Sequence, residues 1–121
     1  MAVQFNIQPQ EEISVVQCFG NILFGDDARD LTDAVTGLLR QDATVVVNLA
    51  SVPRVDCAGI GLLVGFYNQA AARGGRLTFC CPTRKVAEAL KLTQLRRALE
   101  IFDTEACALA AAQNTPCMAW A

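Results

Sequence analysis

The sequence of 121 residues contains no histidine, no pair of cysteines spaced C-x-x-C, and no long apolar run. Without histidine, a Cys–His catalytic pair is impossible, and no metal site is expected. No apolar stretch reaches the roughly 18 residues that a membrane-spanning helix needs, so we expect no membrane insertion. The N-terminus also lacks a basic segment followed by an apolar run, which favours a cytoplasmic location over secretion.

Charge of either sign is also scarce, with 10 Lys and Arg residues against 12 Asp and Glu residues. The two signs are interspersed, and no basic stripe is available to neutralise phosphates, so nucleic acid is not expected as a partner. Arg96 and Arg97, with Lys91 nearby, are interpreted as a solvated face. Hydrophobic residues make up 53% of the chain, which indicates a globular protein and excludes a disordered one.

Six cysteines are many for a chain of this length. Because no secretory signal is expected, we predict no structural disulfide, and most of these cysteines should be small buried hydrophobic residues. Cys80 and Cys81 would point to opposite faces of a strand, so they are not expected to share a metal ion. The six are Cys18, Cys57, Cys80, Cys81, Cys107 and Cys117.

Hydrophobic periodicity predicts strands that alternate with helices after an initial hairpin. The predicted strands cover 3–8, 13–19, 44–49, 76–81 and 98–102. The predicted helices run from an N-cap at Asp26 or Asp27 to about 41, and over 58–73, 83–92 and 104–112. The β-branched run at 44–49 is typical of a central parallel strand. This order predicts a single α/β domain over 1–112 and a loosely attached tail over 113–121, where Trp120 is the candidate anchor.

The most informative segment is the buried strand at 45–49 with the loop and helix start that follow it. Function in α/β sheets tends to lie at the carboxyl ends of parallel strands. Asp56 is a good N-cap for the next helix, whose first turn would present free N–H groups to an anion. A capping role and a recognition role for Asp56 both remain open.

This segment resembles the signature of the STAS domain, the family of anti-sigma factor antagonists. The family pattern is an apolar strand ending in Asp or Asn plus Leu, a short loop, and then Asp-Ser-Ser/Thr/Ala-Gly-Leu-Gly. The resemblance implies a STAS-like fold, with a mixed β-sheet and about four helices packed mainly on one face. The residues in register are Asn48-Leu49, Asp56, Gly59, Ile60 and Gly61, and the similarity continues through Gly74-Gly75-Arg76-Leu77, Pro82, Val86, Leu90, Leu95 and Ile101-Phe102.

The resemblance implies a protein-binding module without enzymatic activity or cofactor. Its partner would be an anti-sigma factor, often itself a serine kinase, whose sequestration frees a sigma factor. In the family, phosphorylation of the first Ser after the Asp ends binding. Here Cys57 holds that place and Ala58 follows, so the phosphosite-equivalent residue lacks the oxygen nucleophile that a serine kinase needs. The implied partner-binding residues are Asp56, Cys57, Ala58, Gly59 and Ile60.

Two other functions stay open. Stand-alone STAS domains also serve as accessory subunits of transporter ATPases. Cys57 is also a candidate redox-responsive thiol, because a helix N-terminus stabilises thiolates, although the carboxylate of Asp56 opposes this effect. The sequence leaves the oligomeric state open between a monomer and a weak dimer.

Several residues near the signature have a simpler structural interpretation. Gly59, Gly61 and Gly65 do not form a dinucleotide-binding loop, because Val64 stands where the third glycine is needed. We interpret them as small residues that let a helix approach the sheet closely. Ser51, Thr83 and Thr93 are alternative phosphorylation sites, although Thr83 is first a candidate helix cap.

Overall fold

The computed structural model describes residues 4–10, 13–23, 25, 28–40, 44–92 and 99–112. The elements follow the predicted order β-β-α-β-α-β-α-β-α. The strands are β1 (Gln4–Gln10), β2 (Ile13–Phe19), β3 (Thr44–Ser51), β4 (Leu77–Cys80) and β5 (Ile101–Phe102). The helices are α1 (Arg29–Arg40), α2 (Cys57–Ala72), α3 (Arg84–Leu92) and α4 (Glu105–Ala112). The predicted caps Asp26 and Asp27, Thr93 and the tail with Trp120 lie outside the described residues.

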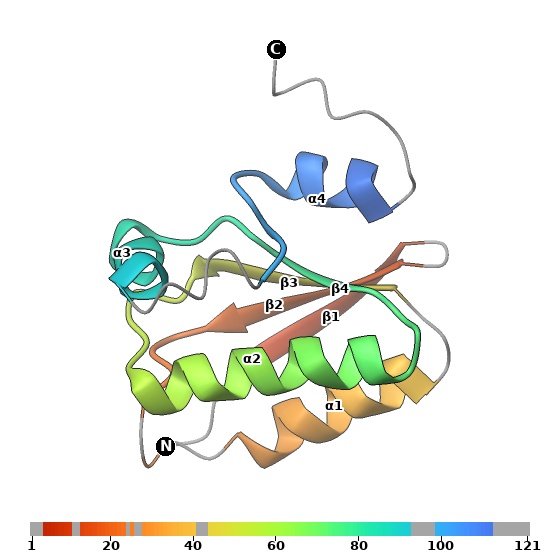
Figure 1. Cartoon of the computed structure of the whole chain (residues 1–121), viewed down its shortest axis with the longest axis horizontal. Helices are drawn as coiled ribbons and strands as arrows, with labels where there is room; N and C mark the ends of the chain where they lie inside the picture. The colour runs from red at the N-terminus through yellow and green to blue at the C-terminus, as the bar shows by residue number, and fades with distance from the viewer. Residues whose placement is uncertain are drawn as a thin grey trace.

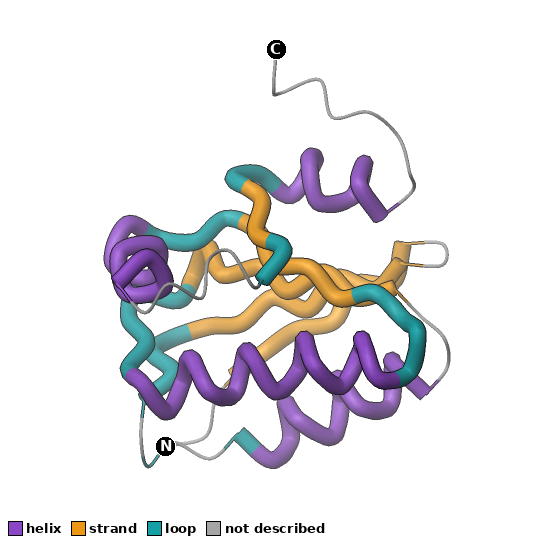
Figure 2. The backbone as a smooth tube through the Cα atoms, viewed as in Figure 1, coloured by secondary structure: helices purple, strands orange, loops and turns teal. Residues whose placement is uncertain are grey.

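The described strands form one mixed sheet in the order β1-β2-β3-β4-β5 (Figures 1 and 2). β1 and β2 are the antiparallel hairpin, and the remaining pairs are parallel. Val45, Val46 and Val47 of β3 are at most 1% exposed, because layers cover both faces of the sheet. The prediction of a buried central parallel strand at 44–49 is therefore confirmed.

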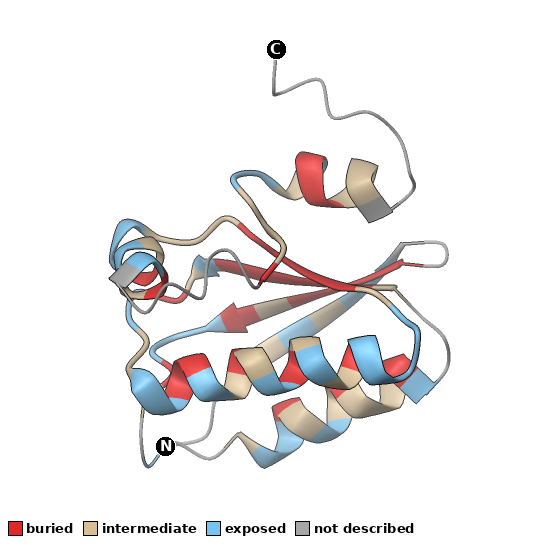
Figure 3. Cartoon of the chain, viewed as in Figure 1, coloured by how far each residue is buried: buried red, intermediate tan, exposed pale blue. Residues whose placement is uncertain are grey.

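The helices lie mainly on one face of the sheet, as predicted. α1 and α2 run side by side beneath it, whereas α4 lies on the opposite face (Figure 1). α1 buries Leu31, Val35 and Leu39, which are spaced to form one face of a helix. Val86 and Leu90 of α3 join the same core cluster. Figure 3 shows the buried residues of α1 and α2 facing the sheet, and no described helix is both long and apolar enough to cross a membrane.

The strand predicted at 76–81 ends one residue early. Cys81 has a φ of +57°, in the left-handed region, so the extended chain stops at Cys80. Pro82 follows, and a proline disfavours the right-handed helical conformation for the residue before it. The expectation that Cys80 and Cys81 point to opposite faces of a strand is therefore wrong. Their thiol groups share a hydrogen bond instead.

The prediction that the protein contains no disulfide is also wrong. Cys107 of α4 is disulfide-bonded. The other described cysteines, Cys18, Cys57, Cys80 and Cys81, are free, and Cys117 lies outside the described residues. The prediction depended on the expected compartment, which says nothing about which sulfur atoms the fold brings together.

Candidate functional site

The predicted site lies where β3 gives way to α2, at the carboxyl edge of the parallel strands. The loop between them is fixed on one side by the chain that follows β2. The amide of Gly20 donates to the carbonyl of Ser51 at 2.9 Å, and the amide of Ile22 donates to the carbonyl of Arg54 at 3.0 Å. Ile22 also forms a parallel β-bridge with Val55. These contacts fix the backbone up to the residue before Asp56.

The start of α3 holds the loop from another side. The hydroxyl of Thr83 donates to the carbonyl of Val52 at 2.9 Å. It also accepts the amide of Val86 at 3.4 Å, which confirms the predicted capping role of Thr83. Val52 itself is fully buried. Because neighbours on both sides bond the loop, the first turn of α2 is presented in a defined position.

Asp56 is the N-cap of α2. Its backbone is extended, with a φ of −109°, and its Oδ1 accepts the amide of Gly59 at 3.0 Å. This bond satisfies one of the N–H groups that the first turn of a helix leaves without an intrahelical partner. The capping role predicted for Asp56 is confirmed. The side chain is half-buried, so one edge of the residue still faces solvent.

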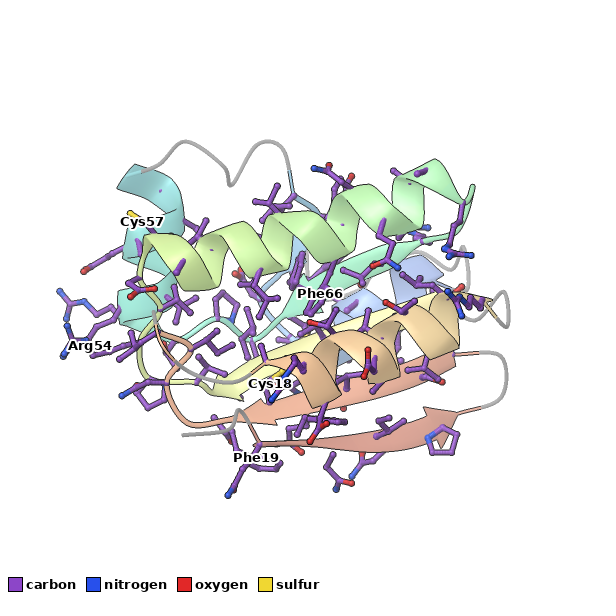
Figure 4. The ribbon with its side chains drawn as sticks, turned by 90° about the horizontal axis from the view of Figure 1, so that it is seen from below. Cys18, Phe19, Arg54, Cys57 and Phe66 are labelled. Carbon is purple, nitrogen blue, oxygen red and sulfur yellow. The ribbon has the colours of Figure 1, made fainter. Side chains whose placement is uncertain are left out.

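The five predicted partner-binding residues divide into an outer and an inner group. Cys57 and Ala58 are exposed at the first turn of α2, and Figure 4 shows Cys57 at the outer end of the helix. Gly59 and Ile60 are buried, and Ile60 belongs to the main core. Cys57 and Ala58 are therefore accessible to another molecule. Gly59 and Ile60 instead fix the position of the first turn of α2.

Gly59 allows α2 to lie directly against the loop that follows β2. A Cβ atom at this position would overlap the carbonyl oxygen of Ile22 and lie 3.1 Å from its carbonyl carbon. Neither Gly61 nor Gly65 has such a neighbour within 4 Å. The predicted close approach is thus confirmed for Gly59 and wrong for the other two.

The sequence analysis missed two exposed residues near the end of the sheet where β2 and β3 finish, Phe19 and Arg54. Phe19 is the last residue of β2. It is 38% exposed, and among the described residues it is the large hydrophobic side chain that is exposed to solvent. Arg54 is exposed in the loop before Asp56, and Figure 4 shows it on the same side of the molecule as Cys57. The ladder between β2 and β3 shifts register between Gln17 and Phe19. Gly20, directly after Phe19, was the sequence signal that Phe19 is the last residue of its strand.

A comparison with known protein families supports the resemblance noted in the sequence. The family model of the STAS domain matches residues 4–108, most of the chain. The chain belongs to the STAS domain family. No curated protein sequence matches this STAS domain.

Solved structures show the same fold. A putative anti-sigma factor antagonist from Thermotoga maritima is 20% identical with a TM-score of 0.80, covering 90% of this chain and 94% of that one. The anti-sigma factor antagonist SpoIIAA in its unphosphorylated form is 20% identical with a TM-score of 0.73, covering 94% and 100%. A sulfate transporter family protein from Wolinella succinogenes is 22% identical with a TM-score of 0.70, covering 88% and 89%. At these identities the likeness shows the fold.

The side chains of this STAS domain hold its thiols in contrasting environments. Cys57 is exposed, whereas burial of Cys18 in the core raises the pKa of its thiol to about 12. Across the described part of the chain, no three His, Cys, Asp or Glu residues are grouped so as to hold a metal ion.

We expect a maleimide to label Cys57 of the folded protein while Cys18 stays unlabelled. The thiolate is the reactive species, and burial denies Cys18 both ionisation and access. Peptide mass mapping after brief labelling, with and without denaturant, checks this result. Cys18 should react in denaturant, which provides the control. Rapid labelling of Cys18 in native buffer would contradict its buried position.

Proposed function

We propose that this STAS domain is an anti-sigma factor antagonist that binds an anti-sigma factor of the serine kinase type. Its docking surface would consist of Phe19, Arg54, Asp56, Cys57 and Ala58. The observation that carries the proposal is the exposed Cys57–Ala58 turn, held in place behind the capping bond from Gly59 to Asp56. The resemblance of this segment to the family signature, in which this turn corresponds to the regulatory motif, supports the proposal.

The chemistry of the docking surface suits protein binding. Phe19 supplies exposed apolar area and Arg54 a cation, and aromatic residues and arginine are the residue types enriched at the centres of interfaces. The partner should therefore offer an apolar pocket near Phe19 and a carboxylate near Arg54. Cys57 has no histidine to activate it, because the chain contains none, which supports a binding module over an enzyme. With a partner of this kind, we also propose a cytoplasmic location.

We further propose that Cys57 replaces the phosphorylated serine and removes phosphorylation as an off-switch. We expect the unmodified chain to accept no phosphate at residue 57 from its partner kinase, and Cys57→Ser to accept it. The reason is that the kinase reaction needs a hydroxyl oxygen in line with the γ-phosphate. Intact-mass measurement after incubation with the kinase and ATP, followed by peptide mapping, tests this expectation.

Cys57→Ala is the matched control, because it also lacks a hydroxyl and should stay unmodified. A stable phosphate on Cys57 of the unmodified chain would contradict the proposal. A Cys57→Ser protein that is never phosphorylated would show that the surrounding turn is no longer a kinase substrate.

A second candidate function is that of an accessory STAS subunit bound to a transporter. The similarity to the sulfate transporter family protein favours it, since that match covers 89% of that chain. Affinity capture from the native cell, with the captured proteins identified by mass spectrometry, distinguishes the two. We expect an anti-sigma factor to be captured by the unmodified chain and lost with Arg54→Glu. Capture of a transporter subunit in its place would assign the second function.

A further inference from the structure

Cys80 and Cys81 form a pair of free thiols in direct contact, on a different element from the docking surface. Cys80 is the last residue of β4 and is fully buried, and Cys81 follows it and is half-buried. A hydrogen bond joins the two side chains. Successive residues of a regular strand point to opposite faces, so this contact requires a departure from strand geometry.

The backbone at Cys81 supplies that departure. Cys81 has a φ of +57°, and among the described residues other than glycine it is the one with a positive φ. A residue other than glycine in this region is strained, and such strain persists where the surrounding structure enforces it. The amide of Cys81 donates to the carbonyl of Phe102 at 3.0 Å, which ties the turn to β5. The fold thus holds Cys81 so that its sulfur lies beside that of Cys80.

The surroundings make the two thiols chemically unequal. Cys80 belongs to the smaller core cluster, together with Val46 and Ala108. Burial first, and then the neighbouring Cys81 and Glu105, raise the pKa of the Cys80 thiol. The carboxylate of Glu105 is itself held in place by the side-chain amide of Asn48 at 3.2 Å. Cys81, which is partly exposed, is therefore the sulfur that meets reagents from solution.

We propose that Cys80 and Cys81 are a redox modification site that closes to a vicinal disulfide by exchange with a small-molecule disulfide. The Cys81 thiolate attacks one sulfur of the small disulfide, forms a mixed disulfide and releases one small thiol. The sulfur of Cys80 then attacks that of Cys81, and the second small thiol leaves with the proton that Cys80 gives up. The two protein thiols are oxidised to one disulfide, and the small disulfide is reduced to two thiols.

The resulting disulfide should be easily reversed. Adjacent Cα atoms are about 3.8 Å apart across a trans peptide, whereas the Cα atoms of ordinary disulfides are roughly 4.4–6.8 Å apart. A bond forced outside that range is strained and more readily reduced. Two residues further on, Thr83 bonds the carbonyl of Val52 in the loop that leads to Cys57. Thr83 thus links the segment of the modification site to the loop of the docking surface, and the two sites share no residue.

The test uses the full chain carrying Cys57→Ala, so that the exposed thiol of α2 does not compete. The protein is incubated with oxidised glutathione in mildly alkaline buffer, and its remaining thiols are then alkylated. The masses of its tryptic peptides are measured by mass spectrometry. The peptide 77–84 contains both cysteines and no other. We expect this peptide to lose two hydrogens, to carry no glutathione, and to regain both thiols on mild reduction.

The single variants separate the two steps. Cys80→Ser should leave glutathione attached to Cys81, and Cys81→Ser should leave Cys80 unmodified. Glutathione that persists on Cys81 while Cys80 is present, or a peptide 77–84 that never reacts, would overturn the proposal. Phenylarsine oxide gives a second measurement without substitution at either cysteine, because it bridges two neighbouring thiols with loss of one water. We expect one arsenical per peptide 77–84, and its absence would equally contradict the paired geometry.

Discussion

Replacement of Gly59 by alanine is expected to destabilise the folded protein by about 1–3 kcal/mol or more, the range observed for overpacked positions. The added methyl group would overlap the carbonyl oxygen of Ile22. That carbonyl cannot move freely, because the amide of Ile22 bonds Arg54 and the residue is bridged to Val55. The helix start would have to shift outward instead, which also displaces Cys57. Thermal and denaturant unfolding measure the effect.

Gly61→Ala is the matched control on the same helix. Its Cβ would meet no atom within 4 Å, and alanine is favoured over glycine inside a helix by roughly 0.5–1 kcal/mol. Gly61→Ala should therefore melt at the same temperature as the parent or higher, whereas Gly59→Ala melts lower. Equal melting temperatures for the two variants would show that α2 does not lie against the Ile22 loop as described.

Much of the fold follows from patterns that the sequence displays. The β-branched run of β3 predicts a central parallel strand, because a strand buried on both faces needs apolar side chains at nearly every position. Asp56 was predictable as a cap from its residue type and its place before an apolar helix. The resemblance to the family signature then predicted which end of the sheet carries the site, and Cys57 and Ala58 are exposed at that end.

Other features depend on contacts between distant segments. Gly59 differs from Gly61 only in its helical phase, which places it on the stripe shared with Leu63 and Phe66. That stripe was visible in the sequence, but the loop of Ile22 that it meets was not. The conformation of Cys81 likewise results from its bond to Phe102, a residue 21 positions further along the chain.

An acidic residue in place of Cys57 is expected to abolish partner binding while leaving the fold intact. Cys57 is exposed in the first turn of α2. A carboxylate there is favoured by the helix dipole by about 0.3–1 kcal/mol, so Cys57→Asp and Cys57→Glu should not lower the melting temperature. In the proposed complex the same carboxylate would be buried beside Asp56 without a counter-charge. A buried unpaired charge at an interface costs about 2–5 kcal/mol, which weakens affinity at least tenfold.

Cys57→Ala separates the effect of charge from the loss of the thiol. It removes the sulfur without adding a charge, so its affinity should stay close to that of the parent. A loss of affinity in Cys57→Ala as large as that in Cys57→Asp would mean that the thiol itself is required. Thermal melts of all the variants show that any loss of binding is not a loss of folding.

The measurement that tests the central claim most directly is calorimetric titration of the captured anti-sigma factor with the parent, Cys57→Ala and Cys57→Asp. If the first turn of α2 is the docking surface, the parent and Cys57→Ala bind with similar affinity, and Cys57→Asp binds at least tenfold more weakly at an unchanged melting temperature. Equal binding by all three would show that the partner does not contact residue 57 and would contradict the proposed docking surface.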